Sequence, residues 1–404
     1  MREIKKPKLT LGADGNTNQV VISGIVSDSE SEDCDDPSIF KNTGRKRVLL
    51  LAKVDGIPET YHNVKILLDS LDLPSLSEDF QIVCDLKMIN IILGIQSCSS
   101  LYSCPYCEGV KLNAEGNPTN QRGKWGKGTL RTTKNITDHF NDYMDEEFPD
   151  RKKIKNFKSV EFEPIKLKHN MQDEWVALTL TPDPLHINLL GGPNDCLQVM
   201  EKEFPEEIKL FYKRHCLSNI GEAAGGKFNG PSIKKILKNL DDLEKSLPDI
   251  AGPLVNFLRI SSKLHTMCIE DTLRENYQET LDEFEDVFET VYELFQMNMT
   301  LKIHVIIHHY ADFFKLTGKN MKTINGEHHE ALHHTLKDFE RKKGYYMRKN
   351  LGSLIHMQKS LKSISQFNTL RAGFLNKEQL RLRKSSTSSS SSPGSSPFKM
   401  NGKG

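Results

Sequence analysis

The sequence predicts an α/β protein in which strands come first and a long, mostly helical segment follows. Three stretches indicate strands: residues 7–27 are β-branched and alternate, residues 45–56 hold an apolar run, and residues 80–94 indicate a strand that continues into a buried helix. From about 193 to 315, apolar residues recur three and four positions apart, which is typical of amphipathic helices.

Composition limits the class of protein. The 404 residues include 55 Lys and Arg and 54 Asp and Glu, and mean hydropathy is −0.51. Because no apolar run is long enough to span a bilayer and the first 20 residues lack the apolar segment of a secretory signal, we expect no membrane partner and reduced cysteines. The net charge of +1 neither predicts nor excludes a nucleic-acid partner.

The order of the elements predicts four segments: residues 1–94 with the strands, 95–303 with a loop-rich part and a helical insertion, 304–383 with further helices, and 384–404. The last segment is rich in Ser, Gly and Pro and cannot form a core, so we expect disorder there. A sheet whose helical partner comes so late in the chain implies a large insertion.

Cys104 and Cys107 form the one CxxC pair. This spacing lets two thiolates bind one tetrahedral ion, and in a reducing compartment it favours metal binding over a redox pair or two ordinary cysteines. A structural zinc needs two further ligands, and histidines can supply them. Eight of the fourteen histidines lie between His304 and His356.

His304, paired with His308 or His309, would complete a Cys2His2 site. The alternative is that these histidines are half-buried residues of an amphipathic helix. A shared zinc would join residues 104–107 to residues 304–309 and close a very long loop.

Carboxylates supply a second candidate site. Asp14 lies at a strand-end turn, Asp85 follows the strand-like stretch 81–84, and Glu327 and Glu330 flank two histidines on an expected helix. Three carboxylates from distant segments could bind two divalent cations, as phosphodiester chemistry requires. Alternatively, each is one of the many acidic residues of the surface.

Three further patterns indicate other functions or partners. His329 to His333 match HExxH, which would indicate a zinc hydrolase and would leave the CxxC pair unexplained. Residues 120–135 and 341–349 combine cations with aromatic residues, which suits contact with a phosphate backbone or a solvated loop. Residues 44–47 and 381–384 are short basic stretches of the kind that direct proteins to the nucleus.

These motifs, in this order, resemble the catalytic core of the recombination-activating V(D)J recombinase family and its Transib-like transposase relatives. The resemblance covers roughly residues 8–370. Asp14-Gly15 resembles the first catalytic strand, and Asp85 precedes Cys104 by the family's interval of 19 residues. The segments 181–189, with His186 in the family's histidine position, and 225–237 are similar to two later family elements. The family's two zinc histidines are five residues apart, as His304 and His309 are.

The resemblance implies an RNase H-like mixed sheet interrupted by a large, zinc-containing, mostly helical insertion. It implies that Asp14, Asp85 and Glu330 bind two Mg²⁺ or Mn²⁺ ions, because Glu330 fits the family's glutamate better than Glu327. It also implies one structural Zn²⁺ on Cys104, Cys107, His304 and His309. The activity would be that of a DDE-type DNA transposase or recombinase, which nicks double-stranded DNA at transposon ends and transfers the strand.

The resemblance further implies a nuclear protein, a homodimer and an accessory subunit. Two departures favour a truncated or decayed element: the chain starts a few residues before the first catalytic strand, and the stretch between Asp14 and Asp85 is shorter than in the vertebrate recombinase. The alternative function is therefore that of a catalytically silent, domesticated protein that binds DNA or protein partners.

Overall fold

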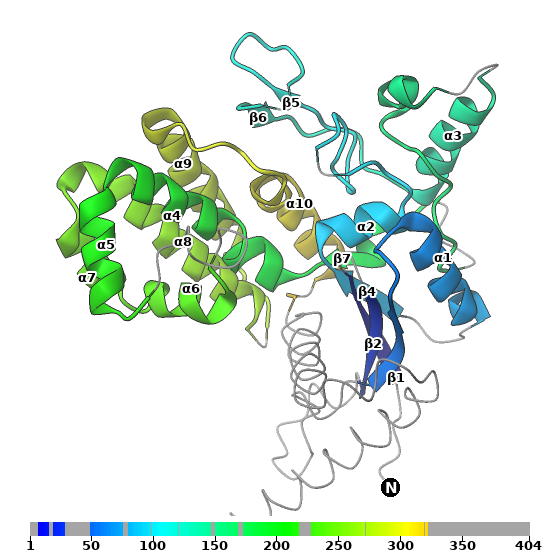
Figure 1. Cartoon of the computed structure of the whole chain (residues 1–404), viewed down its shortest axis with the longest axis horizontal. Coiled ribbons are helices and arrows are strands. Elements are labelled where there is room, and N and C mark those ends of the chain that lie inside the picture. The colour runs from blue at the N-terminus through cyan, green and yellow to red at the C-terminus, as the bar shows by residue number, and fades with distance from the viewer. Residues whose placement is uncertain are drawn as a thin grey trace, which may run out of the picture. The chain divides into compact units, whose positions relative to one another are not determined.

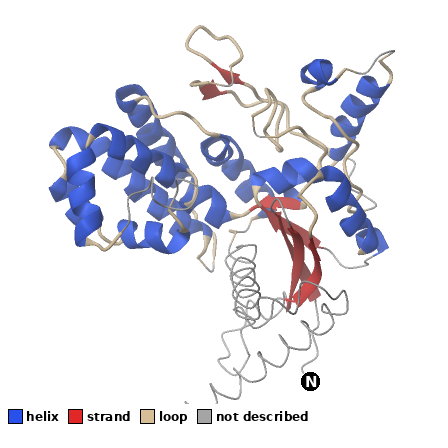
Figure 2. Ribbon diagram, viewed as in Figure 1, coloured by secondary structure: helices blue, strands red, loops and turns tan. Residues whose placement is uncertain are grey.

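The computed structural model describes residues 7–15, 19–28, 49–75, 80–97, 99–119, 121–146, 150–168, 173–217, 228–270, 272–318 and 320–321. All of them belong to one compact unit. The chain is a mixed α/β protein, as predicted, with one five-stranded sheet, a two-stranded hairpin and many helices (Figures 1 and 2).

The five strands of the main sheet are ordered β3-β2-β1-β4-β7. Strand β2 runs antiparallel to both β3 and β1, whereas β4 runs parallel to β1 and β7 runs parallel to β4. Their bounds are β1 Pro7–Gly15, β2 Gln19–Asp28, β3 Leu49–Asp55, β4 Phe80–Cys84 and β7 Leu180–Pro182.

Strand β1 is central, and successive residues 10–13 are buried on both faces. Its apolar neighbours β2 and β4 contribute Val20, Ile22 and Ile82, each 1 % exposed or less. Burial on both faces explains why these strands have nearly continuous apolar runs. The predicted strand pair at residues 7–27 and the strands within 45–56 and 80–94 are confirmed.

Helices follow two of these strands. Asp85 directly follows β4 and caps α2 (Leu86–Ile92), because its carboxylate accepts a hydrogen bond from the Met88 amide at 2.8 Å. Helix α2 contacts β1, β7 and α1 (Tyr61–Ser70). The expected continuation of β4 into a buried helix is therefore present.

The loop-rich part contains more regular structure than the sequence indicated. It holds the hairpin β5 (Lys111–Leu112) and β6 (Lys124–Trp125), helix α3 (Thr133–Met144), and the 3-10 helices η3 (Arg151–Phe157) and η4 (Val176–Leu178). Another 3-10 turn, η2 (Leu73–Ser75), follows α1. Thr132 and Asn135 form a reciprocal capping box that starts α3, a signal that the apolar periodicity does not carry.

The helical region predicted from about 193 to 315 is confirmed, and a short π-helix that was not predicted, η5 (Leu185–Leu189), precedes it directly after β7. The α-helices are α4 Gly192–Glu203, α5 Pro205–Arg214, α6 Gly230–Leu237, α7 Leu240–Ser246, α8 Gly252–Cys268, α9 Tyr277–Phe295 and α10 Leu301–Thr317, with the turn η8 Asp249–Ala251.

Helix α8 lies at the centre of this group and contacts α4, α7, α9 and η5. Helix α10 contacts α9, η4 and η5, so it links the helical region to the segment around β7. None of the helices that the structure describes has the length and apolarity needed to cross a lipid bilayer. The predicted segment boundaries stay predictions.

Candidate metal centre and carboxylate cluster

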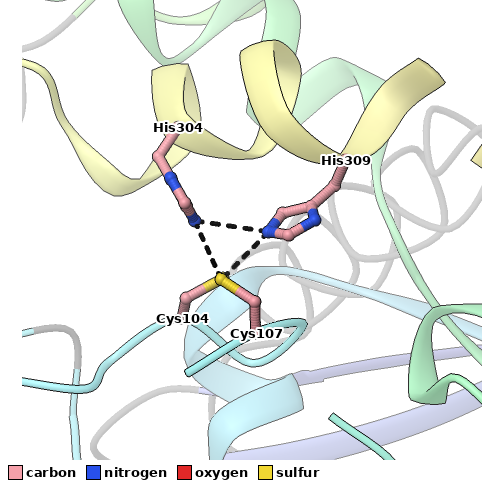
Figure 3. A group of neighbouring side chains, drawn as sticks. All are labelled: Cys104, Cys107, His304 and His309. Carbon is pink, nitrogen blue, oxygen red and sulfur yellow. Dashed lines mark hydrogen bonds between the residues drawn. The ribbon is translucent and has the colours of Figure 1, made fainter. Parts of the chain in front are cut away.

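Four metal-binding side chains converge where the loop before β5 meets helix α10. Cys104 and Cys107 come from the loop, and His304 and His309 come from the helix (Figure 3). All four residues are buried, and their ligand atoms lie within 4.8 Å of one another. This group could hold a metal ion, as the sequence predicted.

The distances fit a tetrahedral zinc site. Sγ of Cys104 lies 3.5 Å from Nε2 of His309, Sγ of Cys107 lies 3.4 Å from Nε2 of His304, and the two Nε2 atoms are 3.2 Å apart. Ligand bonds of about 2.0–2.3 Å at tetrahedral angles separate ligand atoms by roughly 3.3–3.8 Å. Two sulfur and two imidazole nitrogen donors are also a ligand set that zinc prefers.

The helix selects His309 and not His308 as the second histidine. Nε2 of His308 hydrogen-bonds the carbonyl of Trp125 at 2.9 Å, and His308 is not part of the converging group. The rings of Trp125 and Tyr106 lie 5.0 Å from His304 and 5.8 Å from His309, respectively. The ligands are therefore shielded from water by aromatic side chains, which keeps the site dry.

Arg131 holds the CxxC loop in shape. Its guanidinium is fully buried and donates from Nε to the carbonyls of Cys104 and Cys107, at 3.0 and 3.1 Å. Its Nη2 donates to the carbonyls of Tyr102 and Lys158, at 3.1 and 2.9 Å. One side chain thus joins four backbone positions around the two thiols.

The electrostatics favour the protonation states that a metal needs at Cys107 and His304, whereas burial, together with the neighbouring Cys107, raises the pKa of the Cys104 thiol well above its usual value. Hydrogen bonds, first from Cys104 and then involving His304 and His309, hold the pKa of Cys107 well below its usual value. Burial lowers the pKa of the His304 imidazole to about 4, so this ring is neutral near neutral pH. A thiolate and neutral imidazoles are the forms that bind zinc.

A second cluster lies at one edge of the main sheet, and strand register creates it. Ala13 on β1 pairs with Cys84 on β4, and Cys84 pairs with Pro182 on β7. The next residue on each of these parallel strands is an aspartate: Asp14, Asp85 and Asp183. Parallel neighbours lie about 4.8 Å apart, so the three aspartates stand in a row.

The three aspartates of this row differ in burial and in their contacts. Asp14 and Asp85 are half-buried, whereas Asp183 is 4 % exposed. Asp183 accepts a hydrogen bond from the Leu185 amide at 3.0 Å, and its other oxygen lies 3.7 Å from Nε2 of His186. Asp183 therefore also stabilises the start of the π-helix η5, whereas Asp14 and Asp85 are less deeply buried.

Glu59 adds another carboxylate to the same edge. It precedes α1, and its side chain is 3 % exposed and paired with Lys87 of α2. The pKa of Glu59 is raised mainly by burial, and the negative charges of Asp85 and Asp14 add to this, while the hydrogen bond from Lys87 opposes it. Glu59 thus lies close enough to both aspartates to feel their charge.

Glycine at position 15 permits this approach. A Cβ at Gly15 would lie 2.9 Å from Cγ of Glu59, closer than two carbon atoms can pack. Strand β1 therefore ends on a residue with no side chain, and the Glu59 stem occupies the space. The Asp-Gly pair lies at a strand end, as the sequence predicted, and it is also where the side chain of Glu59 packs.

The remaining predicted residues lie outside the described part of the chain. These are Glu330, its rival Glu327 and the HExxH histidines His329 and His333. Their assignment stays a prediction. The structure brings Asp14 and Asp85 together.

The basic segment 120–135, whose composition suits contact with a phosphate backbone, makes contacts within the protein. Lys124 pairs with Glu289 of α9, Lys127 pairs with Asp312 of α10 at 2.6 Å, and the Arg122 guanidinium lies over the Tyr292 ring. These contacts join the segment to α9 and α10. Nucleic-acid contact by this segment stays a prediction.

Sequence reasoning missed Glu59, Asp183 and Lys87 as neighbours of the predicted aspartates. Asp183 carries a sequence signal, because it lies in the segment 181–189 that also contains His186. The strand before it, β7, is only three residues long and shows no alternation that would reveal it as a strand. For Glu59 and Lys87 no local signal exists, since their proximity depends on how α1 and α2 pack.

Comparison with known proteins supplies no relative. No protein-family model matches the chain, and no curated protein matches it at a significant level. The fold and the two side-chain clusters therefore carry the functional argument.

Proposed function

We propose that this chain is the catalytic core of a DDE-type DNA transposase or recombinase, in which Asp14, Asp85 and Glu330 bind two Mg²⁺ or Mn²⁺ ions. The observation that carries the proposal is the register of two strands. Asp14 and Asp85 are 71 positions apart in the sequence but directly follow paired residues on the parallel neighbours β1 and β4. Chemistry on a phosphodiester needs carboxylates in this kind of proximity.

The sheet supports the same proposal. Three antiparallel strands followed by two parallel ones, in the order 3-2-1-4-7, is the arrangement expected of an RNase H-like sheet with its last strand delayed by an insertion. The large stretch between β7 and α10 is helical, and α10 returns the zinc histidines to the loop that follows α2. A single structural Zn²⁺ on Cys104, Cys107, His304 and His309 would hold this return in place.

The carboxylates fit divalent metal ions. Hard cations prefer carboxylate oxygens, and clustered carboxylates repel one another unless cations lie between them. Ions bound here would stabilise the attacking and leaving oxygens of a phosphodiester. The chain would contribute the positions of these groups. The register of β1 and β4 holds Asp14 and Asp85 side by side, and Glu59 adds a third carboxylate at the same edge of the sheet. Buried Asp183 would orient His186 next to them.

The partners follow from the activity. The substrate we propose is double-stranded DNA at the ends of a transposable element, with the protein acting in the nucleus as a homodimer and with an accessory subunit. The zinc-bound loop and α10 would be structural in this scheme. A catalytically silent protein that binds DNA or protein partners is the alternative outcome of the test below.

The test is metal-dependent nicking of supercoiled plasmid DNA by the purified full chain. We expect nicking with Mg²⁺ or Mn²⁺, and loss of nicking by at least about a hundredfold in Asp14→Asn and Asp85→Asn. Asp69→Asn, an exposed residue of α1, is the matched control and should nick normally. Folded, zinc-loaded wild-type protein that nicks nothing would support the silent alternative instead.

A further inference from the structure

A lysine occupies the position of a counter-ion among the carboxylates at the sheet edge. Lys87, on the first turn of α2, pairs with Glu59. Burial lowers the pKa of Lys87, but the hydrogen bond to Glu59 and the charges of Glu59, Asp85 and Asp14 together outweigh it and raise the pKa. One ammonium group therefore interacts with all three carboxylates.

The two members of the pair differ in their access to water. The Glu59 side chain is 3 % exposed, whereas the Lys87 side chain is 55 % exposed. Glu59 is held in place by its packing against Gly15, but Lys87 reaches in from solvent on a flexible stem. The ammonium group can leave Glu59 and return to water with no repacking of the core.

We propose that Lys87 is the resident counter-cation of the carboxylate cluster, and that a divalent ion bound by Asp14 and Asp85 replaces it at Glu59. This inference rests on the proposed function, because it concerns the same metal site. The exchange transfers no proton and breaks no covalent bond: Glu59 changes partner from an ammonium group to a metal ion, and Lys87 turns to solvent.

Charge gives the direction of the effect. Without a cation, three carboxylates at one edge repel one another, and Lys87 reduces that repulsion in the metal-free protein. The same positive charge repels an arriving divalent ion and competes with it for Glu59. Lys87 should therefore stabilise the empty site and weaken metal binding.

A purely structural role is the competing explanation. The Glu59–Lys87 pair also ties the loop before α1 to α2, which contact each other. Under that explanation, removing Lys87 would loosen the site and weaken metal binding. The two explanations predict opposite changes in affinity, so one measurement separates them.

The experiment measures Mn²⁺ binding to the full chain by electron paramagnetic resonance of free Mn²⁺, for wild type and Lys87→Met. We expect Lys87→Met to bind Mn²⁺ at least about fivefold more tightly, with the size limited by solvent screening of a half-exposed charge. Lys87→Arg keeps the charge and should match wild type within about twofold. Lys65→Met removes an exposed lysine of α1 and serves as the matched control.

Unchanged or weaker Mn²⁺ binding by Lys87→Met would overturn the inference while leaving the proposed function intact. If wild-type protein shows no Mn²⁺ binding that Asp14→Asn abolishes, the proposed function and the inference fall together. As a second readout, Mn²⁺ should raise the thermal unfolding midpoint more in Lys87→Met than in wild type. This comparison of each protein with itself remains informative if the variant is less stable.

Discussion

Sγ of Cys107 lies 3.4 Å from Nε2 of His304, although 197 positions separate the two residues along the chain. An unfolded chain rarely brings such distant groups together, because closing a long loop costs conformational entropy. A metal ion that joins them binds the folded state and therefore stabilises it. This relationship connects the loop after α2 to helix α10 and is the basis of the first prediction.

Cys104→Ser should remove bound zinc and lower the stability of the whole unit. The reason is that a site with three protein ligands and a weak hydroxyl binds zinc far less tightly than Cys2His2. Zinc content and the thermal unfolding midpoint of the purified protein measure both effects. Cys216→Ser changes an exposed cysteine and is the control. A full equivalent of zinc with unchanged stability in Cys104→Ser would show that the assignment is wrong.

The metal-free protein should lose stability in acid. Burial lowers the pKa of His304 from its ordinary 6.5 to about 4 in the folded state. Between these values the unfolded chain binds more protons than the folded one, so the free energy of unfolding falls as pH drops from about 6.5 to about 4. The loss should approach about 3 kcal/mol.

Urea denaturation in the presence of a chelator, at several pH values, measures this dependence. His304→Gln removes the titrating ring and should flatten the curve between pH 6.5 and 4. An equally steep curve in His304→Gln would assign the effect to other groups.

Arg131→Met should destabilise the protein by about 3–5 kcal/mol, because four carbonyls, two of them on the buried residues Cys104 and Cys107, lose their donor at once. Urea denaturation measures the change, and zinc release to a chelator should become faster. Arg151→Met is the control, since the Arg151 side chain is 77 % exposed, and it should change stability by less than about 0.5 kcal/mol. A similar, small effect of both substitutions would contradict the role of Arg131.

Gly15→Ala should weaken Mn²⁺ binding and DNA nicking together. The new Cβ would lie 2.9 Å from Cγ of Glu59, so the glutamate must move away from Asp14 and Asp85. We expect about a tenfold loss of nicking with the zinc content unchanged, because the zinc site lies in other elements. Gly126→Ala, where a Cβ meets no atom within 4 Å, is the matched control. Normal nicking by Gly15→Ala would mean that Glu59 does not need this position.

The sequence by itself determined the mixed α/β class, the strand pair within 7–27, the strands within 45–56 and 80–94, and the helices from about 193 to 315. It also determined Cys104, Cys107 and His304 of the candidate metal centre. These features carry local signals: apolar periodicity follows burial, and CxxC with paired histidines follows the geometry of a tetrahedral ion. The choice of His309 over His308 needed more, because a helix brings both near the sulfurs and only the contact of His308 with Trp125 excludes it.

The tertiary structure alone decided which carboxylates become neighbours. Strand β7 is short and has no pattern of its own, and it forms because β4 offers an unpaired edge beside it. Its register then aligns Asp183 with Asp85 and Asp14. Glu59 and Lys87 meet at this edge only because α1 packs on α2 and Gly15 leaves room for the glutamate. Such contacts join residues far apart in the chain, and packing, not local periodicity, selects them.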